Sequence, residues 1–160
     1  MIIRKGTLSD LYRITYVEAE CFPAAEAASA DDFKNRLLFY PNHFWVIENK
    51  GEIIGFINGM CSNTRELHDE MYSNAALHDE NGEWQMIFGV DILPEYRGRG
   101  CARLLLKYMI ADARSSNRTG LILTCKDKLL GYYSKFGFKD EGISDSNHGG
   151  AKWHKMRLTL

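Results

Sequence analysis

The segment from Val90 to Ala102 (VDILPEYRGRGCA) brings glycine and arginine together in a pattern that could hold an anionic ligand. Arg97, Gly100 and Ala102 follow an apolar run that ends at Pro94, in the spacing R-x-x-G-x-A. Glycine lets the backbone approach a ligand closely, and the first turn of a following helix offers unpaired N–H groups at the positive end of its dipole. The pattern therefore suits a pyrophosphate. The alternative is an ordinary strand-to-helix turn with solvated arginines.

The elements that must position this loop follow the order β-α-α-β-β-β-α-β-α-β-β. The apolar run over 84–93 predicts the strand before the loop, and 100–115 predicts the helix after it, with Leu104, Leu105, Tyr108 and Met109 on one face. Further strands are expected over 1–5, 44–48, 52–61, 119–125, 138–143 and 152–159, and further helices over 9–22, 29–40 and 128–135. This mixture is typical of a single α+β domain over residues 1–160.

Length and composition narrow the class of protein. The chain has 160 residues, with 20 Lys+Arg against 21 Asp+Glu and a formal net charge of −1. This length suits one domain with its own core, and the charge balance argues against nucleic-acid binding. No apolar run approaches a membrane span, and the N-terminal residues show no signal-peptide pattern. The cysteines (21, 61, 101 and 125) form neither a CxxC nor a metal-binding pattern, so we expect free thiols, no metal site and a cytoplasmic location.

Three segments together resemble the GNAT family of acyl-CoA N-acetyltransferases. R-x-x-G-x-A at 97–102 fits the pyrophosphate loop of that family, and the preceding VDILPEY at 90–96 fits its strand. LGYYSKFGF at 130–138 is similar to its helix-to-strand signature, and the resemblance covers essentially the whole chain. ECFPAAEAAS at 20–29 and CKD at 125–127 are similar to the serotonin (aralkylamine) N-acetyltransferase-like branch.

The resemblance implies the GNAT fold and acetyl-CoA as cosubstrate. In that α+β fold about four helices flank a mixed, mostly antiparallel sheet of about six or seven strands, and two parallel strands splay apart. Here these would be 84–93 and 119–125, with pantetheine between them. The backbone of Val90, Asp91 and Ile92 would pair with pantetheine and polarise the acetyl carbonyl. The residues implied to hold the pyrophosphate are Arg97, Gly98, Arg99, Gly100, Cys101, Ala102 and Arg103.

The resemblance also assigns roles in the reaction. Tyr133 matches the family tyrosine near the thioester sulfur, where it would protonate or hydrogen-bond the leaving thiolate; packing in the core is the alternative. Relatives carry a base on the strand equivalent to 84–88. Here Trp84, Met86 and Phe88 occupy those positions, and none of them can accept a proton.

Three other residues are candidates for the group that takes the proton from the amine. Glu20 could face the acceptor, a bulge could bring Glu83 into register, and His78 lies in a nearby loop. For each of them the alternative is an exposed position without a role. We therefore expect proton removal through water, with no single indispensable base.

The acceptor side carries acidic and aromatic residues. Residues 66–83 contain six acids and no Lys or Arg, and in the GNAT fold this segment borders the acceptor entrance. Negative charge there would attract a cationic amine, although acidic loops are more often simply solvated. The aromatic residues that could form a wall for the amine are Phe22, Trp45, Trp84 and Phe88.

The sequence thus predicts an N-acetyltransferase that moves acetyl from acetyl-CoA to a primary amine. A small aryl- or alkylamine is favoured, with direct attack in a ternary complex and no acetyl-cysteine intermediate. The alternatives are a protein or peptide N-acetyltransferase and a catalytically inactive CoA-binding module. Expected partners are the small amine and, from the family, a second copy in a homodimer, with no nucleic acid and no membrane.

Overall fold

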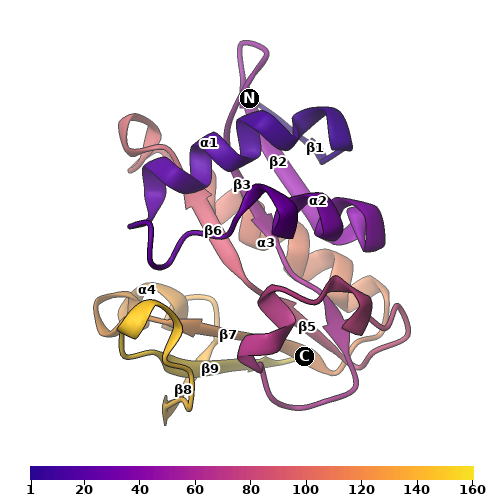
Figure 1. The fold of residues 1–160 in the computed structure, drawn as a ribbon. Coiled ribbons are helices and arrows are strands. Elements are labelled where there is room, and N and C mark those ends of the chain that lie inside the picture. The colour runs from indigo at the N-terminus through magenta and orange to yellow at the C-terminus, as the bar shows by residue number, and fades with distance from the viewer.

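The computed structural model describes residues 1–160 as four α-helices and nine β-strands joined by turns (Figure 1). The helices are α1 (Leu11–Cys21), α2 (Ala30–Phe39), α3 (Cys101–Ser115) and α4 (Leu130–Ser134). The strands are β1 (Ile2–Lys5), β2 (Phe44–Asn49), β3 (Glu52–Asn58), β4 (Cys61–Ser62), β5 (Trp84–Ile87), β6 (Gly89–Ile92), β7 (Gly120–Cys125), β8 (Lys139–Ile143) and β9 (His154–Thr159). The predicted α+β class is confirmed. None of the helices combines the length and apolar character needed to cross a membrane.

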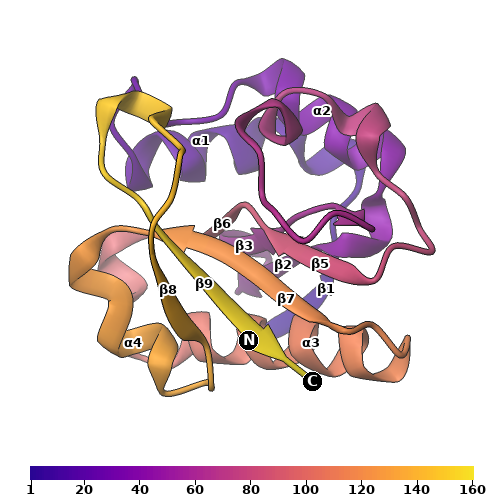
Figure 2. The same ribbon diagram turned by 90° about the horizontal axis from the view of Figure 1, so that it is seen from below.

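The strands form two sheets in the middle of the molecule. One has the order β1-β2-β3-β6, and the other has the order β4-β5-β7-β9-β8. β5 and β7 pair in parallel, whereas the other pairs are antiparallel. Figure 2 shows α1 and α2 on one side of the strands and α3 and α4 on the other. Both faces are therefore covered, and most core residues lie between these layers.

A β-bulge divides the predicted strand 84–93 into β5 and β6. Phe88 donates its N–H to the carbonyl of Asn58 at 2.8 Å, and Gly89 is the register partner of the same Asn58. Phe88 and Gly89 thus both oppose Asn58 of β3, and such a bulge bends a strand and increases its twist. As a result, β5 stays beside β7 while β6 continues along β3. This division and the separate short strand β4 explain why the strands number nine rather than six or seven.

Helix α3 packs on the sheet through a stripe of residues four apart. The residues of this buried stripe are Cys101, Leu105, Met109 and Ala113. The prediction that Leu104 and Tyr108 share the buried face is wrong, because their side chains are 44% and 45% exposed. The buried face of α3 includes the small residues Cys101 and Ala113 at its two ends. The sequence prediction considered only the larger apolar residues and therefore placed this face incorrectly.

Candidate active site

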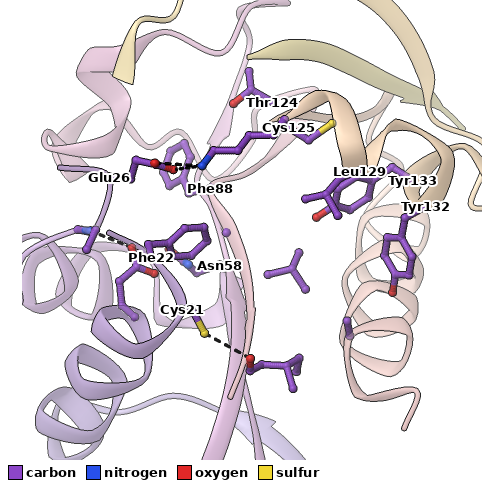
Figure 3. A pocket seen from close by; sticks show the side chains of 18 of the residues that line it. Cys21, Phe22, Glu26, Asn58, Phe88, Thr124, Cys125, Leu129, Tyr132 and Tyr133 are labelled. Atoms are coloured by element: carbon purple, nitrogen blue, oxygen red, sulfur yellow. Dashed lines mark hydrogen bonds and ion pairs between the residues drawn. The ribbon is translucent and has the colours of Figure 1, made fainter. Parts of the chain in front are cut away.

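A cavity of about 910 Å³ opens where β6 and β7 diverge (Figure 3). Parallel pairing of β5 with β7 ends at the partners Ile87 and Leu123. Beyond that point Thr124 and Cys125 pair with β9, and β6 has turned toward β3. The predicted splay of the two parallel strands is confirmed. The wedge between them forms the inner part of the cavity.

Strand β6 presents backbone polar groups to this wedge. Leu93 donates its N–H to the carbonyl of Ile54 at 2.8 Å, so the alternation of an antiparallel ladder turns the polar groups of Val90 and Ile92 away from β3. The carbonyl of Ile92 accepts a hydrogen bond from Arg97 Nε at 2.9 Å. The N–H and carbonyl of Val90 and the N–H of Ile92 are thus the groups available to an extended ligand.

The loop that enters α3 leaves six successive N–H groups without an acceptor. No hydrogen bond is donated by the backbone of residues 98–103, and the first bonded N–H is that of Leu104, 3.1 Å from the carbonyl of Gly100. Gly98 and Gly100 have φ angles of 78° and 82°, in the left-handed region that favours glycine. The unpaired groups and the helix dipole together form an anion-binding surface at one end of the cavity.

The arginines of this loop differ in their placement. Arg97 and Arg103 line the cavity, whereas the Arg99 guanidinium lies 5.3 Å from the centre of the Tyr96 ring, and Arg99 does not line the cavity. The backbone of Arg99 still contributes one of the six free N–H groups. The other residues predicted to hold the cofactor that line the cavity are Val90, Ile92, Gly98, Gly100, Cys101, Ala102 and Tyr133. Asp91 does not, because its side chain leaves the strand on the other face from Val90 and Ile92 and is buried against Glu18.

Tyr133 projects from α4 toward the wedge (Figure 3). Its ring packs edge-on against Tyr132 and Phe138, with centroids 5.3 Å and 6.1 Å away. No protein group hydrogen-bonds its hydroxyl, which faces the cavity. Burial, with smaller contributions from Cys125 and Tyr132, raises the pKa of Tyr133. The hydroxyl is therefore a proton donor over the ordinary pH range, with a hydrogen-bonding position open to a ligand.

None of the three candidate proton acceptors lines the cavity. Glu20 is exposed, because two residues along a helix turn a side chain by about 200°, which places Glu18 on the inner face instead. Glu83 is exposed before the start of β5, and the bulge occurs at Phe88, at the other end of that strand. His78 belongs to a separate cluster. The assignment of Glu20 and Glu83 as catalytic residues is thus corrected.

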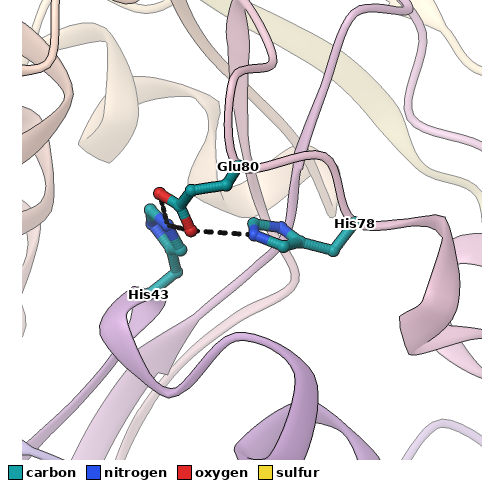
Figure 4. Close-up of side chains that lie close together, drawn as sticks. All are labelled: His43, His78 and Glu80. Atoms are coloured by element: carbon teal, nitrogen blue, oxygen red, sulfur yellow. Dashed lines mark hydrogen bonds and ion pairs between the residues drawn. The ribbon is translucent and has the colours of Figure 1, made fainter.

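His78, His43 and Glu80 form a charge cluster beside β4 (Figure 4). The N–H of Cys61 donates to His78 Nδ1 at 3.0 Å, so the proton of the neutral ring lies on Nε2, 3.0 Å from Glu80 Oε1. His43 Nε2 lies 2.9 Å from the same carboxylate, and Arg118 Nη2 lies 3.2 Å from it. The Arg118 guanidinium and the His78 N–H both point at the Glu80 carboxylate. This arrangement is typical of an ion-pair network rather than of a set of metal ligands.

The acidic side chains of residues 66–83 do not line the cavity. Glu66, for example, lies 2.8 Å from Lys155 Nζ. The segment instead contributes Tyr72, whose hydroxyl is 3.2 Å from Thr124 Oγ1. The prediction of an acidic acceptor rim formed by this segment is wrong, because tertiary contacts pair several of its acids with other groups.

Two of the four aromatic residues expected at the acceptor side line the cavity. Phe22 and Phe88 do so, from the segment after α1 and from the bulge (Figure 3). Trp45 packs instead against Tyr108 at 5.5 Å between ring centroids. Trp84 is buried in a separate small core cluster. The aromatic wall is thus smaller than the sequence suggested.

Two polar side chains of the inner wall were not predicted from the sequence. Glu18 lines the cavity and accepts the N–H of Ala28 at 2.8 Å. Asn58 also lines it, and its Oδ1 accepts Arg36 Nη1 at 2.9 Å, which leaves the NH₂ group for the cavity. Helical spacing from Ile14 would have placed Glu18 on the buried face of α1. Nothing in the sequence marks Asn58.

Contacts between two loops cross the outer end of the cavity. Glu26, after α1, lies 2.8 Å from Lys126 Nζ at the end of β7 (Figure 3). The carbonyl of Glu26 is 2.7 Å from His148 Nε2, and Trp153 Nε1 donates to the carbonyl of His148 at 2.9 Å. We call this group of four residues the outer bridge. It joins the segment before α2 to the segment between β8 and β9.

Comparison with known proteins identifies the family. The model of the acetyltransferase (GNAT) domain family matches residues 41–140, so the chain belongs to this family. It is also 23% identical over 121 residues to "Probable hydrolase YhcX" of Bacillus subtilis. That match covers 71% of this chain, and the chain spans about a quarter of the length of that curated relative (23%).

Solved structures with the same fold confirm the GNAT prediction. The loading GNATL domain of CurA from Lyngbya majuscula has a TM-score of 0.84 and 17% identity, covering 99% of this chain and 96% of that one. The GphF GNAT-like decarboxylase in complex with isobutyryl-CoA has a TM-score of 0.83 and 23% identity, covering 99% of both chains. The ribosomal-protein-S18-alanine N-acetyltransferase from Escherichia coli has a TM-score of 0.74 and 17% identity, covering 99% and 93%.

Proposed function

We propose that this chain transfers an acetyl group from acetyl-CoA to a small primary amine by direct attack in a ternary complex. The observation that carries the proposal is the run of free N–H groups over residues 98–103, which continues into the wedge between β6 and β7. The pyrophosphate would bind these groups, and pantetheine would extend along Val90. The isobutyryl-CoA bound to the GphF neighbour supports an acyl-CoA in a GNAT fold of this shape.

Tyr133 would act in the last step of the reaction, when CoA leaves. The amine nitrogen attacks the thioester carbon, and the C–S bond breaks as the electron pair moves to sulfur. The Tyr133 hydroxyl faces the wedge and is protonated, so it can donate to the departing thiolate. An excess proton on the amide nitrogen then leaves to a base.

The outer bridge favours a small acceptor over a protein or peptide. The Glu26–Lys126 ion pair and the contact of His148 with Glu26 cross the space that an extended chain would need. Phe22 and Phe88 offer apolar surface for an aryl or alkyl group, in line with the resemblance to the aralkylamine branch. The cytoplasmic location and the homodimer stay predictions.

A second candidate function is decarboxylation of a carboxyacyl-CoA. The structural neighbour GphF is a GNAT-like decarboxylase, and the outer bridge of this chain leaves little room for a separate acceptor. The Arg36 guanidinium is 3% exposed, lines the cavity and has no carboxylate within ion-pair distance, so a substrate carboxylate could compensate its charge. In that reaction the bond to the carboxylate breaks, CO₂ leaves, and the resulting enolate takes a proton.

One assay separates these functions. Purified protein is incubated with acetyl-CoA and a panel of arylalkylamines, polyamines, amino acids and peptides, and released CoA thiol is measured. Amine-dependent thiol release supports acetyl transfer, and its preference within the panel gives the acceptor class. Release of CO₂ from malonyl-CoA without free thiol supports decarboxylation. Binding of acetyl-CoA without either reaction supports an inactive CoA-binding module and contradicts the proposal.

A further inference from the structure

A pair of buried carboxyl groups joins α1 to β6 at the inner wall of the cavity. Glu18 and Asp91 are 7% and 1% exposed, and their side chains lie against each other. No N–H or hydroxyl donor reaches either oxygen of Asp91. Two carboxylates at such close range repel each other strongly when both are ionised, so they share a proton.

The surroundings of the pair keep this proton in place. Burial first, and then the negative charge of Glu18, raises the pKa of Asp91 well above its ordinary value. The other titratable or charged groups that act on this part of the site are Cys21 on α1, Arg36 on α2, Tyr133 on α4 and Tyr72 in the segment between β4 and β5. Arg36 acts in the opposite direction to burial, but it does not cancel the rise.

The pair presents Glu18 to the cavity and keeps Asp91 behind it. Glu18 lines the cavity, whereas Asp91 does not. A Cβ built on Gly89 would lie 3.0 Å from Asp91 Oδ1, so the carboxyl is next to the bulge from which β6 diverges. This is the inner end of the wedge, where the acyl group of an extended acyl-CoA would come to lie.

The other acidic side chains of the cavity wall are already engaged. Glu26 is held by Lys126 in the outer bridge. Asp32 accepts the N–H of Ser29 at 3.3 Å as part of the capping box of α2. Glu18 and Asp32 thus have no cation in ion-pair contact, and of the two only Glu18 is buried and packed against a second carboxyl.

We propose that the Glu18–Asp91 pair is the proton acceptor for the amine, with Glu18 as the catalytic residue and Asp91 as a positioning residue. This inference rests on the proposed acetyl transfer. In the active form the shared proton has left to solvent, and the doubly ionised pair then takes one proton from the ammonium group of the acceptor through Glu18 and shares it with Asp91. The neutral amine attacks the thioester and the C–S bond breaks. Tyr133 gives its proton to the departing sulfur and regains one from the nitrogen, and the pair later releases its proton to solvent.

The test compares three variants with the wild type. Glu18→Gln lowers kcat by about 10²-fold or more, the size typical of losing a general base, while the Kd for acetyl-CoA stays the same. Glu20→Gln, a matched change on the exposed face of the same helix, leaves kcat unchanged. Asp91→Asn replaces the shared proton by an amide donor to Glu18, which favours the ionised form of that carboxyl. The acid limb of the pH–rate profile then moves to lower pH, and the plateau rate falls.

The outcomes distinguish this inference from the proposed function. A Glu18→Gln variant within about threefold of the wild-type kcat overturns the role of the pair and leaves acetyl transfer standing, as does an unmoved acid limb in Asp91→Asn. A wild type inactive with every amine overturns both. Circular dichroism and thermal unfolding show whether each variant is folded. The infrared band of a protonated carboxyl, present in the wild type and lost in Asp91→Asn, reports the shared proton without turnover.

Discussion

Lys126 Nζ lies 2.8 Å from the carboxylate of Glu26, so the end of β7 is tied to the segment after α1 across the outer end of the cavity. The contact joins residues 100 positions apart and is reinforced by His148, which bonds the Glu26 carbonyl at 2.7 Å. The same site therefore has an inner wall made by α1 and β6 and an outer bridge made by loops. The size of acceptor that can enter depends on the outer bridge.

Removing this ion pair should widen the range of acceptors. In Lys126→Met the segment after α1 loses its charged partner, and longer amines or short peptides gain access. We expect kcat/KM for a bulky amine to rise relative to that for a small one by about 10-fold, which corresponds to about 1.4 kcal/mol. Lys139→Met, a matched change at an exposed position on β8, leaves the ratio unchanged. An unchanged ratio in Lys126→Met would show that the bridge does not limit access.

Gly100→Ala should weaken binding of acetyl-CoA. At φ 82° an alanine is strained by about 1–2 kcal/mol, and relief of that strain would turn the free N–H groups of the loop away from their common direction. A Cβ there meets no protein atom within 4 Å, so the effect is one of conformation and ligand approach. We expect Kd to rise about 10-fold or more by calorimetry. Gly131→Ala in α4, where φ is not positive and the space is also open, serves as control and should bind as the wild type.

Features formed by residues close together in the sequence could be predicted, whereas features that depend on contacts between distant segments could not. The loop predicted to bind pyrophosphate is local: a strand, two glycines and a helix start lie within 13 residues, and the structure has these elements where they were predicted. The bulge at Phe88 was not predicted, because the run 84–93 was interpreted as one continuous strand, although Gly89 within that run is a local sign of an irregularity. The contact of Glu18 with Asp91 spans two distant segments and depends on how α1 packs on β6. Periodicity could put Glu18 on the inner face, but not beside a second acid.

Tyr133→Phe should slow the chemical step and leave cofactor affinity intact. Removal of the hydroxyl takes away the proton donor to the thiolate, so kcat falls about 10–100-fold while the Kd for acetyl-CoA is unchanged. Burial raises the pKa of Tyr133, so the protonated, active form persists as pH increases, and the wild type shows no alkaline loss of activity from this group below its ordinary pKa of 10.0. Tyr132→Phe on the same helix is the matched control. Equal loss in both variants would assign Tyr133 a packing role.

The His43–His78–Glu80 cluster should make the fold sensitive to acid. Burial lowers the pKa of His78 from its ordinary value of 6.5, so the unfolded chain binds this proton more readily and stability falls as pH drops below about 6.5. The pKa of Glu80 is also lowered, because hydrogen bonds from His43 and His78 outweigh the effect of burial. Its contribution is present above its ordinary pKa of 4.5 and is lost as pH falls further.

Glu80→Gln therefore removes part of the stability at neutral pH. Because the Glu80 side chain is 60% exposed, we expect a loss of about 1 kcal/mol in the free energy of unfolding at pH 7. The difference from the wild type shrinks as Glu80 itself becomes protonated toward pH 4. Denaturant unfolding at both pH values measures it. Glu83→Gln, a change at an exposed acid without an ion-pair partner, is the control and should be as stable as the wild type. If Glu83→Gln lost as much stability as Glu80→Gln, the cluster would not be the cause of the loss.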